Sequence, residues 1–344
     1  MNRDLRELYG AVKENVEKVR CEALWQGFKP LKFALYNDTE CFFDGSYVEK
    51  TEQFLANTAI EYNGEWIAIW YVSGEIDPEV LASKMIHEMF HGFQNMNRDS
   101  RFSNELSALY RYRYSEENLS VKLAENRLIA ELTRAFDAGK LERLLRYRKY
   151  RCECFQYEFI YESRVEQIEG TANYVELQAL KQISPEKYLR KLEKMTQAIT
   201  EPANLLPIRV VSYDIGALLL NMLKENAIPV EQGFGDATFA ESLIENVDCA
   251  ENCGIDESVC RCIEEYFDRA REKIDSAIAQ GSVVTVQESL LLGVNVYNAV
   301  YLSGYIISTY FVMYGDETEP TVAQGDFVIE TAREGVVSKI YRLS

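Results

Sequence analysis

The chain is poor in histidine and in basic side chains. It holds two histidines in 344 residues, and its 37 Lys and Arg residues stand against 55 Asp and Glu residues, for a formal net charge of -18. A surface that binds nucleic-acid phosphates needs clustered Lys and Arg, so we expect no nucleic-acid partner. An anionic membrane surface is disfavoured for the same reason. An acidic surface instead favours solubility and cationic substrates.

Long hydrophobic runs are also missing. The most apolar stretch, around Tyr301 to Tyr314, is interrupted by serine, glycine and threonine and is too short to cross a bilayer. The N-terminal residues, from Met1 to Glu7, lack the apolar core of a signal peptide. The sequence as it stands therefore predicts a cytoplasmic protein with no membrane partner.

Eight cysteines are present, and in a cytosolic chain of this size free thiols are favoured over a disulfide framework. Four of them fall within fourteen residues: Cys249, Cys253, Cys260 and Cys262. Four thiolates could bind a second zinc ion or an iron–sulfur cluster. Their spacing lacks the paired two-residue gaps of structural zinc sites, so ordinary free cysteines are favoured.

Local patterns predict a small N-terminal sheet. A helical pattern in residues 1–30 is followed by a short strand at 31–36. Two further strands, 58–62 and 65–72, flank Asn63-Gly64, the pair typical of a two-residue type I′ hairpin turn. Asp77-Pro78 then provides an N-cap and first turn for a helix at 78–96.

The middle of the chain is helical in pattern, and its end is rich in strand-forming residues. The expected helical stretches are 104–181, with a break at 137–139, then 212–225 and 241–280, and strands are expected from Ser282 onward. Within the first stretch, the Arg- and Tyr-rich segment 143–151 is predicted to be a solvated helix face, with a substrate-facing patch as the alternative.

The pattern as a whole indicates an α+β fold. We expect a mostly helical body that carries the small N-terminal sheet, over residues 1–280, and a small β-rich C-terminal module over residues 281–344.

The two histidines are His87 and His91, with Glu88 directly after the first. Four residues is just over one turn of a helix, so both imidazoles project from one face, where they can bind one zinc ion. Glu88 is turned by about 100° around the helix axis. Its carboxylate would therefore lie beside the metal, where it can act as general base on the zinc-activated water.

The alternative is a pair of buried core histidines. The flanking residues Met85, Ile86, Met89 and Phe90 indicate that this helix is largely buried. Two imidazoles in such surroundings would need hydrogen-bond partners. A zinc ion is the simpler explanation, because random placement rarely produces this motif.

Catalytic zinc needs a third protein ligand, and no third histidine exists. The ligand must then be a carboxylate or a thiolate. The best donor segment is residues 166–174, which contains Glu166 and Glu169. Gly170 and Ala172 place small side chains on one side of this stretch, so that two helices can approach closely.

His-Glu-x-x-His followed by a distant Glu-Gly-x-Ala-x-Tyr resembles the gluzincins, the thermolysin-like zinc metallopeptidases. The resemblance covers the segments 78–96 and 160–180 and implies a zincin-like domain in which Glu169 is the third zinc ligand. Glu166, three residues earlier on the same predicted helix face, is the alternative ligand or a supporting group. Residues 100–155 would be an insertion of helices between the two ligand segments.

The resemblance implies three further roles. The strand Trp66–Val72, which precedes the zinc helix, would offer its edge to an extended peptide. Asn173 stands where thermolysin has an acidic residue that orients a histidine, and its amide can accept a hydrogen bond from an imidazole. Tyr213 opens a Tyr-x-x-Gly pattern and would stabilise the oxyanion; a packing tyrosine is the alternative.

The sequence therefore predicts a zinc-dependent metallopeptidase that acts on a peptide or protein substrate. Zinc would be held by His87, His91 and Glu169, with Glu88 and Tyr213 as catalytic residues. Two alternatives stay open: a binding or regulatory protein that keeps the scaffold without catalysis, and a zinc hydrolase of non-peptide amides.

Overall fold

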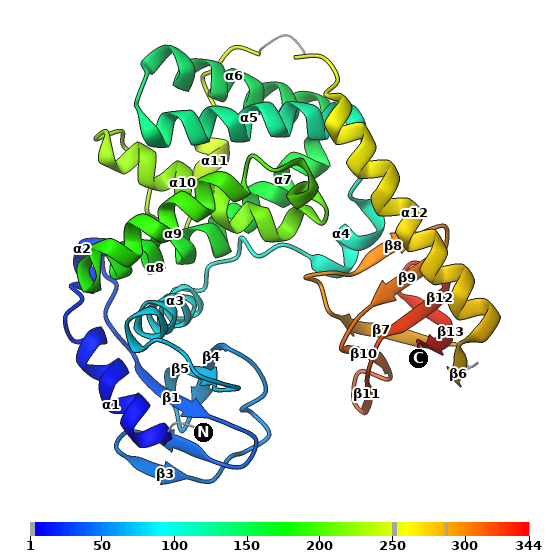
Figure 1. Cartoon of the computed structure of the whole chain (residues 1–344), viewed down its shortest axis with the longest axis horizontal. Helices are drawn as coiled ribbons and strands as arrows, with labels where there is room; N and C mark the ends of the chain where they lie inside the picture. The colour runs from blue at the N-terminus through cyan, green and yellow to red at the C-terminus, as the bar shows by residue number, and fades with distance from the viewer. Residues whose placement is uncertain (1–3, 250–252, 286–287, 344) are drawn as a thin grey trace.

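The computed structural model describes residues 4–249, 253–285 and 288–343. Figure 1 shows three parts in chain order: an N-terminal sheet with its helices, a helical body, and a C-terminal antiparallel sheet. The helical body lies between the two sheets. The predicted α+β fold, with a small sheet at the N-terminal end and strands at the C-terminal end, is confirmed.

The N-terminal sheet has five strands in the order β3-β2-β1-β5-β4, with β1 and β5 parallel and the other pairs antiparallel. Asn63 and Gly64 have φ of 52° and 80°, as a type I′ turn requires, so the predicted hairpin is confirmed. The strands are β1 Lys32–Tyr36, β2 Cys41–Phe43, β3 Ser46–Val48, β4 Thr58–Tyr62 and β5 Glu65–Tyr71.

The expectation that Trp66–Val72 offers a free edge is wrong. Strand β5 is hydrogen-bonded to β1 on one side and to β4 on the other. The hairpin turn folds β4 back along β5 and so covers the edge that the sequence had suggested. Strand β4, residues Thr58–Tyr62, forms the edge of the sheet instead.

Helix α3 spans Pro78–Met96, as predicted, and the Asp77 side chain caps it by accepting from the backbone N–H groups of Glu79 and Val80. The helix packs on β4 and β5. At Gly92 the approach is so close that a Cβ atom would lie 2.5 Å from Leu31 Cδ1. One side of α3 therefore packs against the sheet, and the helix also packs against α8 of the body.

The remaining helices before the C-terminal sheet differ from the predicted stretches mainly at their ends. Residues 1–30 hold two short helices, α10 begins at Ile208 because Pro207 is its N-cap, and the stretch 241–280 is interrupted before α12, whose N-cap is Asp256. Asp137 caps α6 at the predicted break. The helices are α1 Leu5–Val16, α2 Cys21–Leu24, α4 Glu105–Arg111, α5 Glu116–Arg134, α6 Ala138–Cys154, α7 Gln156–Val165, α8 Thr171–Ile183, α9 Pro185–Ala198, α10 Ile208–Glu225, α11 Phe239–Ser242 and α12 Glu257–Gln280.

A π-helical turn, η1, spans Glu166–Gly170 between α7 and α8. It crosses α10 at a pair of glycines. A Cβ on Gly170 would lie 2.8 Å from the Gly216 Cα, and a Cβ on Gly216 would lie 2.8 Å from the Glu166 backbone oxygen. The sequence predicted that Gly170 and Ala172 would let this stretch approach the helix that carries the histidines, but the close approach at Gly170 is to α10.

We expect Gly216→Ala to destabilise the protein by about 1–3 kcal/mol, because the new methyl group meets backbone that cannot move aside. The measurement is the free energy of unfolding from denaturant titration. Gly10→Ala is the matched control, since nothing lies within 4 Å of its added Cβ. In the interior of α1 that change is expected to stabilise by about 0.5–1 kcal/mol. Equal effects of the two substitutions would contradict the close crossing.

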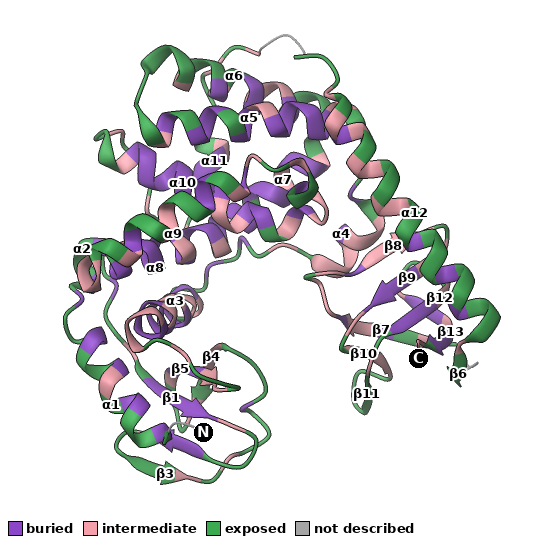
Figure 2. Cartoon of the chain, viewed as in Figure 1, coloured by how far each residue is buried: buried purple, intermediate pink, exposed green. Residues whose placement is uncertain are grey.

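The C-terminal sheet is antiparallel and covered on both faces. Helix α12 packs on one face through Ala270, Ile274 and Ala277, and α4 packs on the other through Leu106 and Leu109. Figure 2 shows buried residues through β9 and β12, and exposed residues along the outer side of α12. The strands are β6 Ser282–Thr285, β7 Ser289–Val294, β8 Val300–Leu302, β9 Tyr305–Ser308, β10 Phe311–Gly315, β11 Pro320–Gln324, β12 Phe327–Arg333 and β13 Val336–Arg342.

Within the described ranges, none of the helices combines the length and the apolar character that a membrane crossing requires.

Candidate metal site

Three predicted ligand residues come together where α3 meets the π-turn η1. The Nε2 atoms of His87 and His91 are 3.1 Å apart. One carboxylate oxygen of Glu169, Oε2, lies 3.3 Å from the His91 Nε2 and 3.9 Å from the His87 Nε2. In the described part of the chain, this is the group of His, Cys, Asp or Glu side chains whose ligand atoms converge, all within 4.8 Å of one another.

The outer ring nitrogens show which protonation state the site favours. Gln94 donates from Nε2 to the Ile168 carbonyl at 3.0 Å, which turns its Oε1 towards the His91 Nδ1, 2.8 Å away. The Nδ1 of His87 lies 3.4 Å from a carboxylate oxygen of Glu176. The Nδ1 of His91 therefore faces an acceptor and carries the proton in the neutral ring, whereas the His87 Nδ1 has the Glu176 carboxylate nearby without a hydrogen bond to it. The two Nε2 lone pairs then point at each other and at a carboxylate, a donor set that suits a metal cation.

Charge interactions between His91 and Glu169 shift the pKa values of both side chains. Burial lowers the pKa of His91, but the Glu169 carboxylate opposes it and raises the pKa to about 9. Burial likewise raises the pKa of Glu169, but the two histidines and Arg209 lower it to about 2. Two imidazole Nε2 atoms and one carboxylate oxygen converge within 4.8 Å, so the residues present fit a zinc ion.

Asn173 does not support a histidine, and that expectation is wrong. Its amide donates to Asp214 of α10 at 3.3 Å. Glu176, three residues further along α8, faces His87 instead. Burial raises the pKa of Glu176, but Lys191 and His87 together hold it well below its usual range, so the side chain stays a carboxylate. A buried carboxylate orients the imidazole more strongly than an amide would.

Glu166 lies away from the histidines, in a cluster of six charged side chains that we call the buried ion cluster. Each is at most 1% exposed. Glu166 binds Lys122 at 3.0 Å and Arg148 at 2.5 Å. The segment 143–151 is therefore no simple solvated face, because two of its arginines are buried. The members are Lys122, Glu125, Arg148, Arg151, Glu162 and Glu166.

The π-turn explains why the carboxylates of Glu166 and Glu169 point in different directions. In a regular α-helix, residues three apart share a face, and the sequence predicted that arrangement. The turn at Glu166–Gly170 has i→i+5 hydrogen bonds, so it is wider and the two carboxylates point in different directions. One pairs with the cations of α5 and α6, and the other reaches the histidines.

Glu169 is itself held by Arg209 of α10. The guanidinium Nη2 lies 3.0 Å from Glu169 Oε1, the oxygen that faces away from the histidines. The same guanidinium pairs with Glu105 of α4. Arg209 thus connects the candidate metal ligand to α4.

The two expected catalytic residues lie on elements that border this site. Glu88 is 8% exposed on α3, and its charge helps to raise the pKa of His91, so it is close to the ligands. Tyr213 lies one turn after Arg209, whose Cζ is 5.3 Å from its ring centre. Burial and the nearby Glu169 raise the pKa of Tyr213, so the phenol keeps its proton. In the described structure its buried hydroxyl has no hydrogen-bond partner, although Tyr297 lies near, with ring centres 6.4 Å apart.

Three residues of the site escaped sequence reasoning: Gln94, Glu176 and Arg209. Two carried a usable signal. Gln94 follows His91 by three residues, and Glu176 follows Glu169 by seven, so each lies on the same helical face as a ligand. No sequence pattern pointed to Arg209, because only the crossing of α10 over the π-turn brings it to Glu169.

Among the described residues, no disulfide joins the four clustered cysteines. Cys249 and Cys253 precede α12, and Cys260 and Cys262 lie on it. Residues two apart on a helix project to different sides. Within the described ranges, which leave out residues 250–252, these cysteines are not part of a converging group of potential metal ligands.

Comparisons of the chain with protein-family models, with curated proteins and with solved structures found no match.

Proposed function

We propose that this protein is a zinc-dependent metallopeptidase whose metal is held by His87, His91 and Glu169. The convergence of two imidazole Nε2 atoms and one carboxylate oxygen within 4.8 Å carries the proposal. Three protein ligands leave the open coordination position that distinguishes catalytic zinc from structural zinc.

Zinc bound there would act as a Lewis acid and would lower the pKa of a water molecule for attack on a carbonyl. Glu88 would accept the proton of the attacking water and pass it on to the leaving amine. Tyr213 would donate a hydrogen bond from its protonated hydroxyl to the developing oxyanion. Gln94 would hold the His91 imidazole in the required tautomer, and the nearby Glu176 carboxylate would orient His87.

The edge strand β4 provides a place for a peptide. It pairs only with β5 in the described sheet and packs beside α3. An extended substrate backbone could add to this edge by main-chain hydrogen bonds. The carboxylate of Glu88 and the protonated phenol of Tyr213, on elements that border the ligands, favour a catalyst over a binding scaffold that has lost its activity.

Purified wild-type protein is expected to contain about one zinc ion per chain, and Glu169→Ala is expected to lose it or bind it far more weakly. Elemental analysis after zinc addition and desalting measures this. Glu105→Ala is the matched control, because that carboxylate also pairs with Arg209 but lies outside the ligand group. Full zinc affinity in Glu169→Ala would remove Glu169 from the site. A wild type that binds no zinc would refute the proposed function.

A further inference from the structure

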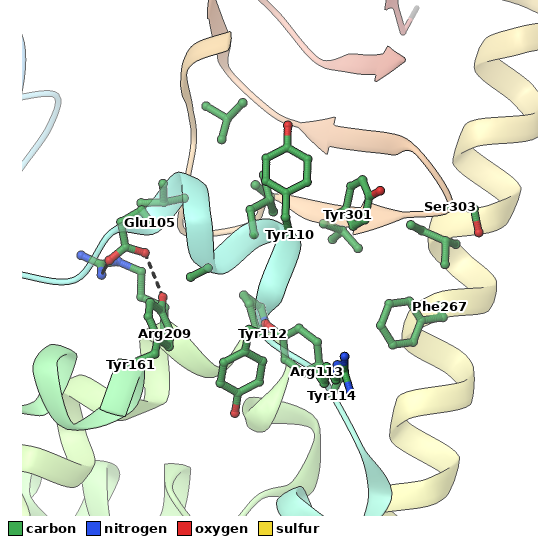
Figure 3. Close-up of a pocket in the computed structure, with 18 of the residues that line it drawn as sticks. Glu105, Tyr110, Tyr112, Arg113, Tyr114, Tyr161, Arg209, Phe267, Tyr301 and Ser303 are labelled. Carbon is green, nitrogen blue, oxygen red and sulfur yellow. Dashed lines mark hydrogen bonds and ion pairs between the residues drawn. The ribbon is translucent and has the colours of Figure 1, made fainter. Parts of the chain in front are cut away.

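A cavity of about 410 Å³ lies between the helical body and the C-terminal sheet. Figure 3 shows its walls, formed by α4 and the segment after it, by α12, and by residues 294–303 of the sheet region. Pockets for small ligands have volumes of roughly 300–1,000 Å³ and often form where two units meet. The cavity therefore has the size and the position of a binding site.

The walls are rich in aromatic rings that are already fixed in place. Tyr112 donates to Glu162 at 2.7 Å, and Tyr161 donates to Glu105 at 2.8 Å. Tyr110 accepts from the Gly335 N–H at 3.2 Å. Rings held in this way offer apolar faces at little entropic cost. The aromatic lining residues are Tyr110, Tyr112, Tyr114, Tyr161, Phe267 and Tyr301.

One lining residue, Arg113, favours an anion in a chain whose net charge is -18. Two arginines, Arg113 and Arg209, and one acid, Glu105, line the cavity. Arg209 is already paired with Glu105 and Glu169. Arg113 is exposed, and no ion pair to its guanidinium is found among the described residues. A carboxylate is the natural partner for an arginine in such a setting.

We propose that this cavity binds a small carboxylate with an aromatic or large aliphatic body. The body would lie among the tyrosines and Phe267, and the carboxylate would pair with Arg113. The ligand is either a free organic acid or the corresponding part of a peptide substrate, because Arg209 joins the cavity to the candidate metal ligand Glu169. The binding chemistry is the same in both cases and does not depend on the proposed peptidase activity.

The test is calorimetric titration of the full chain with 4-phenylbutyrate, in zinc-loaded protein and after chelation. Two variants probe the cavity. Ala299→Phe fills it, because Ala299 is a small, buried lining residue, and it should abolish binding. Arg113→Gln changes an exposed side chain and should weaken binding about tenfold, the usual effect of losing a charged hydrogen bond. The neutral 4-phenylbutanamide should bind about tenfold more weakly than the acid to wild type.

Matched controls separate cavity effects from general ones. Val322→Phe adds a ring at an exposed position of the same sheet, and Arg111→Gln removes a neighbouring exposed arginine outside the lining. Both should bind 4-phenylbutyrate as wild type does.

Absence of binding to wild type, or equal binding to all variants, would overturn the proposal. Where peptide hydrolysis is measurable, competitive inhibition by 4-phenylbutyrate assigns the cavity to the substrate, and binding without inhibition assigns it to a free acid. If 4-phenylbutyrate binds but no peptidase activity is found, the cavity proposal is supported and the proposed function is refuted.

Discussion

Replacing Glu88 by glutamine should reduce peptide hydrolysis by about a hundred- to ten-thousand-fold, the contribution that a positioned general base makes. The amide has nearly the shape of the carboxylate but cannot accept the proton of the attacking water. Zinc content should not change, because Glu88 lies outside the converging ligand group. The measurement is the rate of cleavage of a peptide library by zinc-loaded protein, with zinc quantified in the same samples.

Glu79→Gln is the control for Glu88→Gln. Glu79 lies on the same helix and pairs with Lys187 near the helix start. Its loss should leave both hydrolysis and zinc unchanged. If Glu88→Gln cleaved peptides at the wild-type rate, Glu88 would have no part in the mechanism.

Replacing Lys122 by methionine should destabilise the protein by about 3–5 kcal/mol, the cost typical of removing one partner from a buried ion pair. The Lys122 Nζ lies 2.8 Å from Glu162 and 3.0 Å from Glu166. Without it, three buried carboxylates share two arginines. Burial raises the pKa of Glu162, but Arg151 and Lys122 lower it to about 2, which shows how strongly this carboxylate depends on its cations. Denaturant titration of the folded protein measures the loss.

Lys140→Met provides the comparison for Lys122→Met. The Lys140 Nζ lies 2.7 Å from Glu131, but both side chains are nearly half exposed. Exposed pairs of this kind contribute only about 0–1 kcal/mol. Similar losses from the two lysine substitutions would mean that the buried ion cluster is not a major source of stability.

The sequence predicted features whose causes are local. Asp77 and Pro78 set the start of α3 regardless of the rest of the chain, and Asn63-Gly64 specifies its hairpin turn by backbone conformation alone. The spacing of His87 and His91 likewise places both rings on one face before any tertiary contact forms. Each of these predictions needed only neighbouring residues, and each agrees with the structure.

Features that depend on distant segments were missed or mistaken. The edge assigned to Trp66–Val72 failed because strand order is set by pairing across the sheet. Arg148 appeared solvated because its partners, Glu125 and Glu166, lie on other helices. The side chains of Glu166 and Glu169 point in different directions because of the π-turn, and no residue pattern in the sequence predicts that turn.

The shared guanidinium of Arg209 has a thermodynamic consequence. It bonds Glu169 on one side and lines the cavity on the other. Any ligand that draws Arg209 away from Glu169 changes the affinity of that carboxylate for a cation. Because binding free energies around a cycle must close, the cation changes the affinity for the ligand by the same factor. The two sites would then behave as a linked pair, and either affinity could be read from titrations of the other.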